Sequence, residues 1–306
     1  MRGARRLHGV GGFGVSLIER LQSIGVAPCS NDRAVDYRVR PAGALKYAGV
    51  EPPASERPLV SCLMVTRGNL ELMRHSVECY AQQNWAEREL VVVTDADRTQ
   101  AVGDLLRAFK LKRAQVVGLG AGMTLGDLRN IAIARARGEI LIQWDDDDLS
   151  DPDRIAVAVG VLQREAVGAV FLDRWLIWWP SRQLAAIAFP RACEGSVAMW
   201  RRGARVYPAL TRGEDTLALN YLDEPVGLIN APLQYVYTIT GENTWDEAHF
   251  EAQVAAAEHR FEGDDYRALI GLLAQRLPIV AYEADLRALW ARRDERMEER
   301  GSSQRV

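Results

Sequence analysis

Between residues 59 and 144, short apolar runs alternate with longer segments of helical periodicity, and this alternation restricts the fold more than any other feature. The apolar runs are LVSCLMVT, ELVVVTD, AQVVGL and EILIQW, with the composition of strands buried on both faces. Helical patterns occupy residues 70–83, 101–110 and 124–137 between them. Strands that alternate with helices predict an α/β fold, a Rossmann-like and mostly parallel sheet flanked by helices.

Two helix starts carry local signals. Thr124, followed three residues later by Asp127, predicts an N-cap in a capping-box arrangement. Asp151 before Pro152 predicts a second N-cap, with proline at the first helical position.

The second half of the sequence has a different pattern. Strand-like segments separated by turns are AVFLDRWLIWW, QLAAIAF, GSVAMWRR, VGLIN and LQYVYTIT, and a helix opens at GEDTLALNYL. From Trp245 onward the chain reads as helical and charged. We therefore expect an N-terminal extension and linker (1–58), a main domain (59–245) and a C-terminal helical segment (246–306).

Composition excludes several classes of protein. The net charge of -3 and the pI of about 5.9 give no basic field for nucleic acid. Four widely spaced cysteines form no zinc pattern, and Cys62, in an apolar run, is expected to be a buried free thiol. A reduced, cytoplasmic compartment fits this cysteine pattern best. No apolar stretch approaches the roughly 20 residues that span a bilayer. The arginines near the N-terminus leave peripheral contact with the inner membrane face open, and no signal peptide is recognisable.

Four consecutive aspartates, Asp145 to Asp148, follow the fourth apolar run, and Asp95 ends the second. In an open α/β sheet, ligands bind at the carboxyl ends of strands, so these carboxylates should line one crevice. Adjacent carboxylates repel one another unless solvent or a cation screens them, and their oxygens suit Mg²⁺ or Mn²⁺. An EF-hand is excluded because Ser150 and Ala156 stand where its glycine and glutamate belong. A solvated acidic loop is the alternative.

Four sequence blocks in order resemble the family-2 glycosyltransferases, which have the GT-A fold. LVSCLMVTRGNLELMRHSVECYAQQNW is similar to the opening strand and helix of that family, and ELVVVTDAD to its second strand with an acidic end. GDLRNIAIARARGEILIQWDDDD contains the Asp-x-Asp motif, and RGEDTLAL resembles the Glu-Asp motif that opens a helix in the acceptor half. The resemblance implies a nucleotide-binding half (59–150), an acceptor half (151–245), and inverting transfer of a sugar from a nucleotide-diphosphate donor to an acceptor hydroxyl.

Donor residues are implied by position in these motifs. Thr66 and Asp95 would contact the base and ribose, and Arg129 the base or the diphosphate. Asp145 would orient the ribose and sugar, with Asp146 beside it in the donor-binding set.

The metal would be Mn²⁺ or Mg²⁺, held on the diphosphate by Asp147. Asp148 occupies the additional acidic position, facing the sugar or the water ligands of the metal. When bound, the metal would neutralise the leaving nucleoside diphosphate as a Lewis acid.

The sequence departs from the family pattern at two places. Arg67 and Gly68 replace residues of the usual Pro-Thr-Tyr-Asn ending of the first strand, so Arg67 would stack on the base or contact phosphate. This departure leaves the base open, with a UDP-sugar as the first expectation and a GDP-sugar as the alternative. Thr240 stands near the place of a histidine that can join the metal, and His249 is read as a surface residue.

The acceptor hydroxyl needs a general base, and the resemblance points to Asp215, with its neighbour Glu214 as the weaker candidate. Helix-start acidity that favours the dipole is the alternative explanation of this pair. Four tryptophans of the acceptor half are expected to pack in the core, with one or two available as a sugar platform: Trp175, Trp178, Trp179 and Trp200. Trp245 is expected to anchor the C-terminal helices over the site.

Two other functions remain open from the sequence. A sugar nucleotidylyltransferase also combines an α/β sheet, a nucleotide and a metal, but its glycine-rich phosphate loop has no counterpart in VTRGNLELM. An inactive module that binds nucleotide-sugars or glycans would have no need of the Glu-Asp pair. The acceptor could be a glycan, as in polysaccharide biosynthesis, a lipid-linked molecule or a small molecule. The sequence also leaves open whether the protein forms a homo-oligomer.

Overall fold

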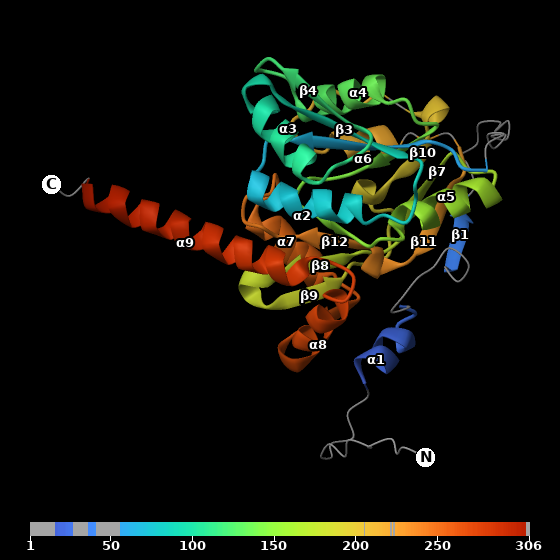
Figure 1. The fold of residues 1–306 in the computed structure, drawn as a ribbon. Coiled ribbons are helices and arrows are strands. Elements are labelled where there is room, and N and C mark those ends of the chain that lie inside the picture. Colours follow the sequence, from blue (N-terminus) through green and yellow to red (C-terminus); the bar gives the residue numbers. More distant parts are fainter. Residues whose placement is uncertain are drawn as a thin grey trace, which may run out of the picture.

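The structure is a computed structural model, and it describes residues 16–26, 36–40, 56–204, 206–220, 222 and 224–303. Within these residues the chain forms an eight-stranded sheet and a five-stranded sheet with helices packed around them (Figure 1). Cys29 and most of the expected linker lie outside the described residues.

Residues 60–143 form a run of alternating strands and helices, as the periodicity predicted. In chain order it consists of β2 (Val60–Thr66), α2 (Leu70–Ala81), β3 (Arg88–Asp95), α3 (Thr99–Ala108), β4 (Ala114–Leu119), α4 (Leu125–Arg135) and β5 (Ile140–Gln143). The four strands are parallel neighbours in the order β5-β2-β3-β4. Their carboxyl ends, and so Thr66, Asp95 and the aspartate run, meet at one edge.

The large sheet continues beyond β5 with strands from the acceptor half. β10 (Ala198–Trp200) lies antiparallel between β5 and β7 (Ala169–Leu172), and β11 (Val226–Asn230) is parallel to β7. β1 (Asp36–Arg40) pairs antiparallel with β11 at the sheet edge. The expected α/β fold with a mostly parallel sheet is confirmed, although antiparallel strands interrupt it.

The smaller sheet determines where the aspartates lie. Its strand order is β13 (His259–Phe261), β9 (Leu184–Ile187), β8 (Leu176–Trp179), β12 (Tyr235–Thr238) and β6 (Leu149–Ser150). β5 belongs to the large sheet and β6 to the small one, so the four aspartates occupy the segment in which the chain passes between sheets. β13 corrects the expectation that residues beyond 245 are entirely helical, because residues 259–261 pair with β9.

The two predicted helix starts have opposite outcomes. Thr124 caps α4 in a complete capping box with Asp127, as predicted. The N-cap prediction for Asp151 is wrong, because α5 (Arg154–Arg164) begins three residues later. The Asp151 carboxylate instead accepts a hydrogen bond from the Asp153 backbone and pairs with Arg276 at 2.6 Å, which satisfies it outside a helix cap.

The last part of the described chain contains three helices. They are α7 (Glu247–Ala255), α8 (Gly263–Leu273) and α9 (Ile279–Ser303), and the far end of α9 projects beyond the body (Figure 1). The start of α9 lies against α2, where the ring of His75 is 2.7 Å from the Asp285 carboxylate. The Tyr282 hydroxyl of α9 donates to the backbone carbonyl of Asp147 at 2.5 Å, so this helix supports the aspartate run directly. α1 (Leu17–Ser23) is tied to α8 by an ion pair between Arg20 and Asp265.

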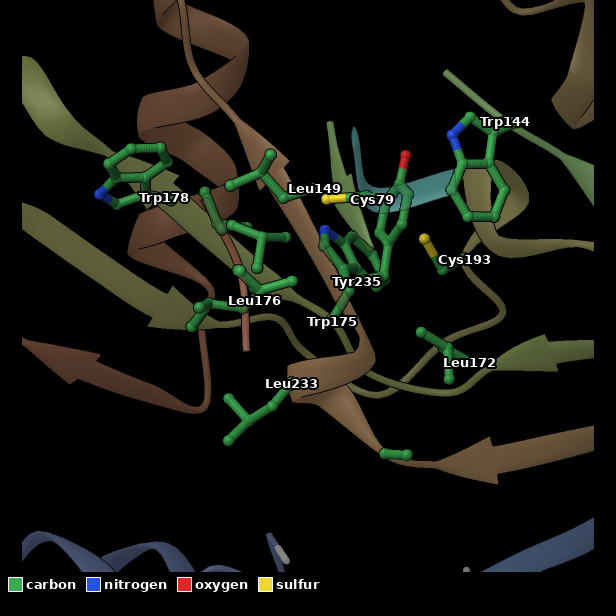
Figure 2. Close-up of a cluster of buried hydrophobic side chains, with 14 of the residues drawn as sticks. Cys79, Trp144, Leu149, Leu172, Trp175, Leu176, Trp178, Cys193, Leu233 and Tyr235 are labelled. Carbon is green, nitrogen blue, oxygen red and sulfur yellow. The ribbon is translucent and has the colours of Figure 1, made fainter. Parts of the chain in front are cut away.

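The core beside the aspartates is apolar and aromatic (Figure 2). Cys79 and Cys193 lie there as buried free thiols, and Cys62 is buried in β2, as expected for reduced cysteines. Burial raises the pKa of each of these three thiols to about 12. Among the described residues, no helix combines the length and the apolar character needed to cross a bilayer.

Candidate active site

A cleft of about 640 Å³ opens between the aspartate run, α4 and the segments 211–216 and 242–245. Its walls include eight of the ten residues implicated by sequence, namely Arg67, Arg129, Asp145, Asp146, Asp147, Asp148, Glu214 and Asp215. Thr66 and Asp95 do not line it. Thr66 is buried at the end of β2, where its carbonyl accepts from Thr94, and Asp95 lies behind Arg67.

Tyr235 holds two of the four aspartates together. Its hydroxyl lies 3.0 Å from Asp145 Oδ2 and forms a shorter hydrogen bond with Asp148. Asp148 also accepts the Thr238 backbone N–H at 2.8 Å, so β12 satisfies it from two positions. A Cβ at Gly195 would lie 2.6 Å from the Tyr235 hydroxyl oxygen, so glycine there permits this contact.

Asp147 is held from a different loop. Asn243 donates through its side-chain nitrogen to Asp147 Oδ2 at 3.3 Å, while its own oxygen accepts the Thr240 backbone N–H at 2.8 Å. Thr240, at the position near the family histidine, is buried and bonds to Asn243 rather than to an aspartate. Asn243 therefore connects the loop after β12 to the aspartate run.

Crowding and burial shift the aspartates toward protonation. Burial, with the neighbouring carboxylates, raises the pKa of Asp147 well above its usual range and that of Asp146 to about 6. Burial and the charge of Asp145 raise the pKa of Asp148 to about 8, against the hydrogen bonds from Tyr235 and Thr238. A cation beside these groups would relieve the repulsion, which is the electrostatic environment that a divalent metal requires.

The donor atoms fit a hard divalent cation but leave its coordination incomplete. Among the described residues, no three or more His, Cys, Asp or Glu side chains are grouped as a metal cage. Asp147 supplies carboxylate oxygens in the cleft, and Mg²⁺ and Mn²⁺ take remaining ligands from water and phosphate. The residues therefore fit a metal that binds together with a diphosphate.

Arg129 joins the two halves of the cleft. From α4 its Nε lies 2.7 Å from Glu214 Oε1, and its Nη2 lies 3.6 Å from Asp145 Oδ1. Burial alone would lower the pKa of this guanidinium, but the surrounding carboxylates of Asp145, Glu214 and Asp215 outweigh burial and raise it. The buried Glu214 is thus occupied by an ion pair.

Asp215 lies next to that pair, at the start of α6 (Glu214–Asn220). Its Oδ1 accepts the Thr216 backbone N–H at 2.7 Å. Burial raises the pKa of Asp215 to about 6, with the charge of Glu214 adding to the shift and that of Arg129 opposing it. A carboxylate with this pKa is suited to accept a proton near neutral pH.

Arg67 is fixed at the other end of the cleft. Its Nε lies 3.1 Å from Asp95 Oδ1 and its Nη2 donates to the carbonyl of Met123 at 3.1 Å. Gly68 next to it allows the close approach of Asp146, because a Cβ there would lie 3.0 Å from Asp146 Oδ2. Asp95 therefore does not line the cleft itself but holds the side chain of Arg67, which does.

Three of the five tryptophans considered in the sequence analysis pack in the core, as expected, and the other two line the cleft. Trp178, Trp179 and Trp200 are buried in the core. Trp175 is buried as well but reaches the cleft wall, and Arg191 lies over its ring at 4.7 Å. Trp245 also lines the cleft, stacked on His249 at 4.3 Å, so His249 is a wall residue rather than a plain surface histidine.

Several cleft residues were not found from the sequence. They are Gln143, Arg191, Glu194, Arg212, Tyr235 and Asn243. Tyr235 sits in a strand-like run without a motif, and it reaches Asp148 because β12 pairs with the two-residue strand β6. Arg212 is the first residue of the RGEDTLAL block, and this position is the signal that could have identified it.

Residues 61–185 match the family model Glycosyl transferase family 2. The match runs from β2 past the aspartate run and agrees with the first three sequence blocks, whereas the Glu-Asp block lies outside it. Within residues 61–185 the chain is similar to this family.

A curated relative and several solved structures are similar to the chain. The relative is the uncharacterized protein y4gI of Sinorhizobium fredii (strain NBRC 101917 / NGR234), 31% identical over 124 residues, which are 39% of this chain and only 13% of the relative. Crystal structures of S. aureus TarS 1-349 are similar at 17% identity and a TM-score of 0.47, covering 65% of this chain and 70% of that one. The mannosyltransferase PcManGT from Pyrobaculum calidifontis, in complex with GDP-Man and Mn2+, is 20% identical with a TM-score of 0.49, covering 79% and 73%.

Proposed function

We propose that the protein transfers a sugar from a nucleotide-diphosphate donor to an acceptor hydroxyl by a single, inverting displacement that depends on a divalent cation. One observation carries the proposal. A single cleft contains the acidic run at the end of β5 and the Asp215 carboxylate at the start of α6, with Arg129 between them. A donor site and a base on opposite walls are what a direct displacement needs.

The donor would occupy the end of the cleft formed by the nucleotide-binding half. Arg67, held in place by Asp95, is available to the base or a phosphate, with Asp145 and Asp146 toward the ribose and sugar. Mn²⁺ or Mg²⁺ held by Asp147, with Asp148 behind it, would supply Lewis-acid stabilisation of the leaving diphosphate.

The acceptor would enter from the opposite wall. Asp215 would accept the hydroxyl proton as the oxygen attacks the anomeric carbon. Glu214 would position Arg129, because its buried side chain is held in an ion pair with this arginine. The contacts of these side chains support both proposed roles.

Calorimetric titration with UDP and GDP, in EDTA and then in Mn²⁺, tests the donor site. Binding that requires Mn²⁺, followed by release of nucleoside diphosphate from a nucleotide-sugar, supports the proposal. Formation of nucleotide-sugar from a nucleoside triphosphate would indicate a nucleotidylyltransferase instead. Binding without release of diphosphate, in the presence of a broad set of acceptors, would indicate a binding module.

A further inference from the structure

The cleft contains one arginine that has no carboxylate partner. Four arginines line its walls, and three of them hold carboxylates: Arg67 with Asp95, Arg129 with Glu214 and Arg191 with Glu194. Across the ranges from 16 to 303 that the structure describes, the fourth, Arg212, has no acidic side chain within ion-pair distance. Its positive charge is therefore available to something that enters the cleft.

Arg212 is held beside an exposed aromatic ring. Its guanidinium carbon lies 4.5 Å from the centre of the Trp245 ring. Trp245 is 38% exposed and stacks almost parallel on His249, with ring centres 4.3 Å apart and an angle of 16°. The indole is thus fixed in orientation, and a cation and an aromatic surface lie together at the cleft wall.

Other arginines of the chain that cover tryptophans show the ordinary form of this contact. Arg191 lies over Trp175 and pairs with Glu194 at 2.6 Å. Arg182 lies over Trp179 and pairs with two glutamates of α7. Arg154 lies over Trp144 at 4.9 Å and donates instead to the Ser150 hydroxyl and to the backbone carbonyls of Gln143 and Gly195. In these three contacts the guanidinium is held by polar groups of the protein, whereas Arg212 has no such partner among the described residues.

The position of Arg212 points to the acceptor. It lies three residues before Asp215, and Gly213, with a φ of +72°, turns the chain between them. Arg212 is therefore close in the chain to the proposed base, and its contact with Trp245 places both side chains on the same wall of the cleft. Arginine binds carboxylate and phosphate groups in a bidentate manner, and aromatic rings pack against sugar rings.

We propose that Arg212 and Trp245 form an acceptor subsite for an anionic glycan or polyol, whose carboxylate or phosphate binds Arg212 while its ring or chain packs on Trp245. This inference rests on the proposed sugar transfer and specifies its acceptor class. A uronic acid and a polyol phosphate are the two chemical sources of such a group.

The test uses the full chain with Mn²⁺ and the nucleotide-sugar selected by calorimetry. Transfer is measured by mass spectrometry of the product with matched acceptors: neutral oligosaccharides, the corresponding uronic acid oligosaccharides, glycerol oligomers and glycerol phosphate oligomers. We expect transfer to one anionic series at least 10-fold above its neutral counterpart, and the series that reacts identifies the source. Equal transfer to neutral and anionic members would overturn the inference while leaving sugar transfer itself intact.

The variant Arg212→Gln separates acceptor binding from donor binding. Losing a charge-assisted hydrogen bond should raise KM for the anionic acceptor by about 10-fold to 100-fold, with a smaller change in kcat. Arg212→Lys should recover part of this loss, and the affinity for the nucleoside diphosphate should not change. Arg182→Gln, which removes a guanidinium from Trp179 outside the cleft wall, is the matched control and should leave KM unchanged. Loss of nucleoside diphosphate binding in Arg212→Gln would assign Arg212 to the donor and refute the acceptor subsite.

Discussion

Arg129 and Glu214 form an ion pair between the two halves of the cleft, with Nε 2.7 Å from Oε1. The arginine belongs to α4 of the nucleotide-binding half and the glutamate to α6 of the acceptor half. Because the glutamate is buried and neutralised by this contact, the adjacent Asp215 remains as the carboxylate that faces the cleft with a raised pKa. These contacts support the preference for Asp215 over Glu214 that the family resemblance already suggested.

Asp215→Asn should reduce turnover by at least ~100-fold, the lower end of what a positioned general base contributes. Because the donor site is built from the other half of the chain, calorimetry should show nearly unchanged nucleotide affinity. In the wild-type protein, kcat/KM should fall as the pH drops below about 6, since the base becomes protonated.

Glu214→Gln is the comparison variant. Replacing Glu214 removes one partner of a buried ion pair and leaves Arg129 with its longer contact to Asp145 at 3.6 Å, so this change should lower the thermal unfolding temperature and reduce turnover less than Asp215→Asn does. A wild-type rate in Asp215→Asn would transfer the role of base to Glu214 or Asp148. Loss of donor binding in Asp215→Asn would make the residue structural.

Asp147→Ala should abolish the metal-dependent part of nucleotide binding, so that the variant in Mn²⁺ behaves like the wild type in EDTA. The same change removes a carboxyl group whose ionised form is disfavoured by burial and by the charges of its three aspartate neighbours, so without metal the variant should be at least as stable as the wild type. Calorimetry and thermal unfolding provide the two readouts. Asp97→Ala, an exposed carboxylate beyond β3, is the control; equal nucleotide affinity of Asp147→Ala and this control in Mn²⁺ would remove the metal role of Asp147.

The nucleotide-binding half could be predicted from sequence because its signals are local. Each strand is a continuous apolar run, and the capping box at Thr124 is formed by residues three apart, so neighbours along the chain decide the outcome. The position of the acidic run directly after β5 could be predicted for the same reason, because the run follows an apolar strand in the sequence. Asp151 shows the limit: its local capping signal is overridden by Arg276, which is distant in sequence.

The rest of the site depends on pairings between distant segments. β6 has only two residues and is a strand because β12 pairs with it, which brings Tyr235 to Asp148. β10 enters antiparallel between β5 and β7 without a periodic signal for that position. Asn243 reaches Asp147 from a loop with no recognised motif. These contacts join residues that are distant in sequence, so hydrophobic periodicity and short motifs do not predict them.

Tyr235→Phe should weaken the binding of nucleoside diphosphate with Mn²⁺ by about 10-fold, because a hydroxyl that holds two carboxylates of the site is lost. The fold should persist, since the ring remains in the core. The measurement is the dissociation constant from calorimetry across a Mn²⁺ series. Tyr37→Phe removes a comparable tyrosine-to-carboxylate hydrogen bond, to Glu165, away from the cleft and should leave this constant unchanged. Identical Mn²⁺ dependence in Tyr235→Phe and the wild type would show that the hydroxyl does not organise the aspartates.

The aspartate run should make the metal-free protein less stable as the pH rises from about 7 to 8. In the folded state the pKa of Asp148 is about 8 and that of Asp147 is well above its usual range, whereas unfolded aspartates titrate near 3.9. The folded state therefore holds protons that the unfolded state has released, and stability decreases with pH by about 1.4 kcal/mol per pH unit for each such proton. Above pH 7 the histidines with lowered pKa values, His75, His249 and His259, are mostly neutral in both states and contribute little slope.

Denaturant unfolding in EDTA at pH 7, 7.5 and 8 measures this slope. Asp148→Asn should flatten it, because the amide keeps the shape of the side chain but does not titrate, whereas Asp97→Asn at the surface should leave it as in the wild type. Mn²⁺ should stabilise the protein more at pH 8 than at pH 7, since a cation competes with fewer bound protons there. A stability that rises with pH over this interval in EDTA, or an equal slope in Asp148→Asn, would mean that the aspartates are already ionised in the folded protein and that no cation is needed to relieve their repulsion.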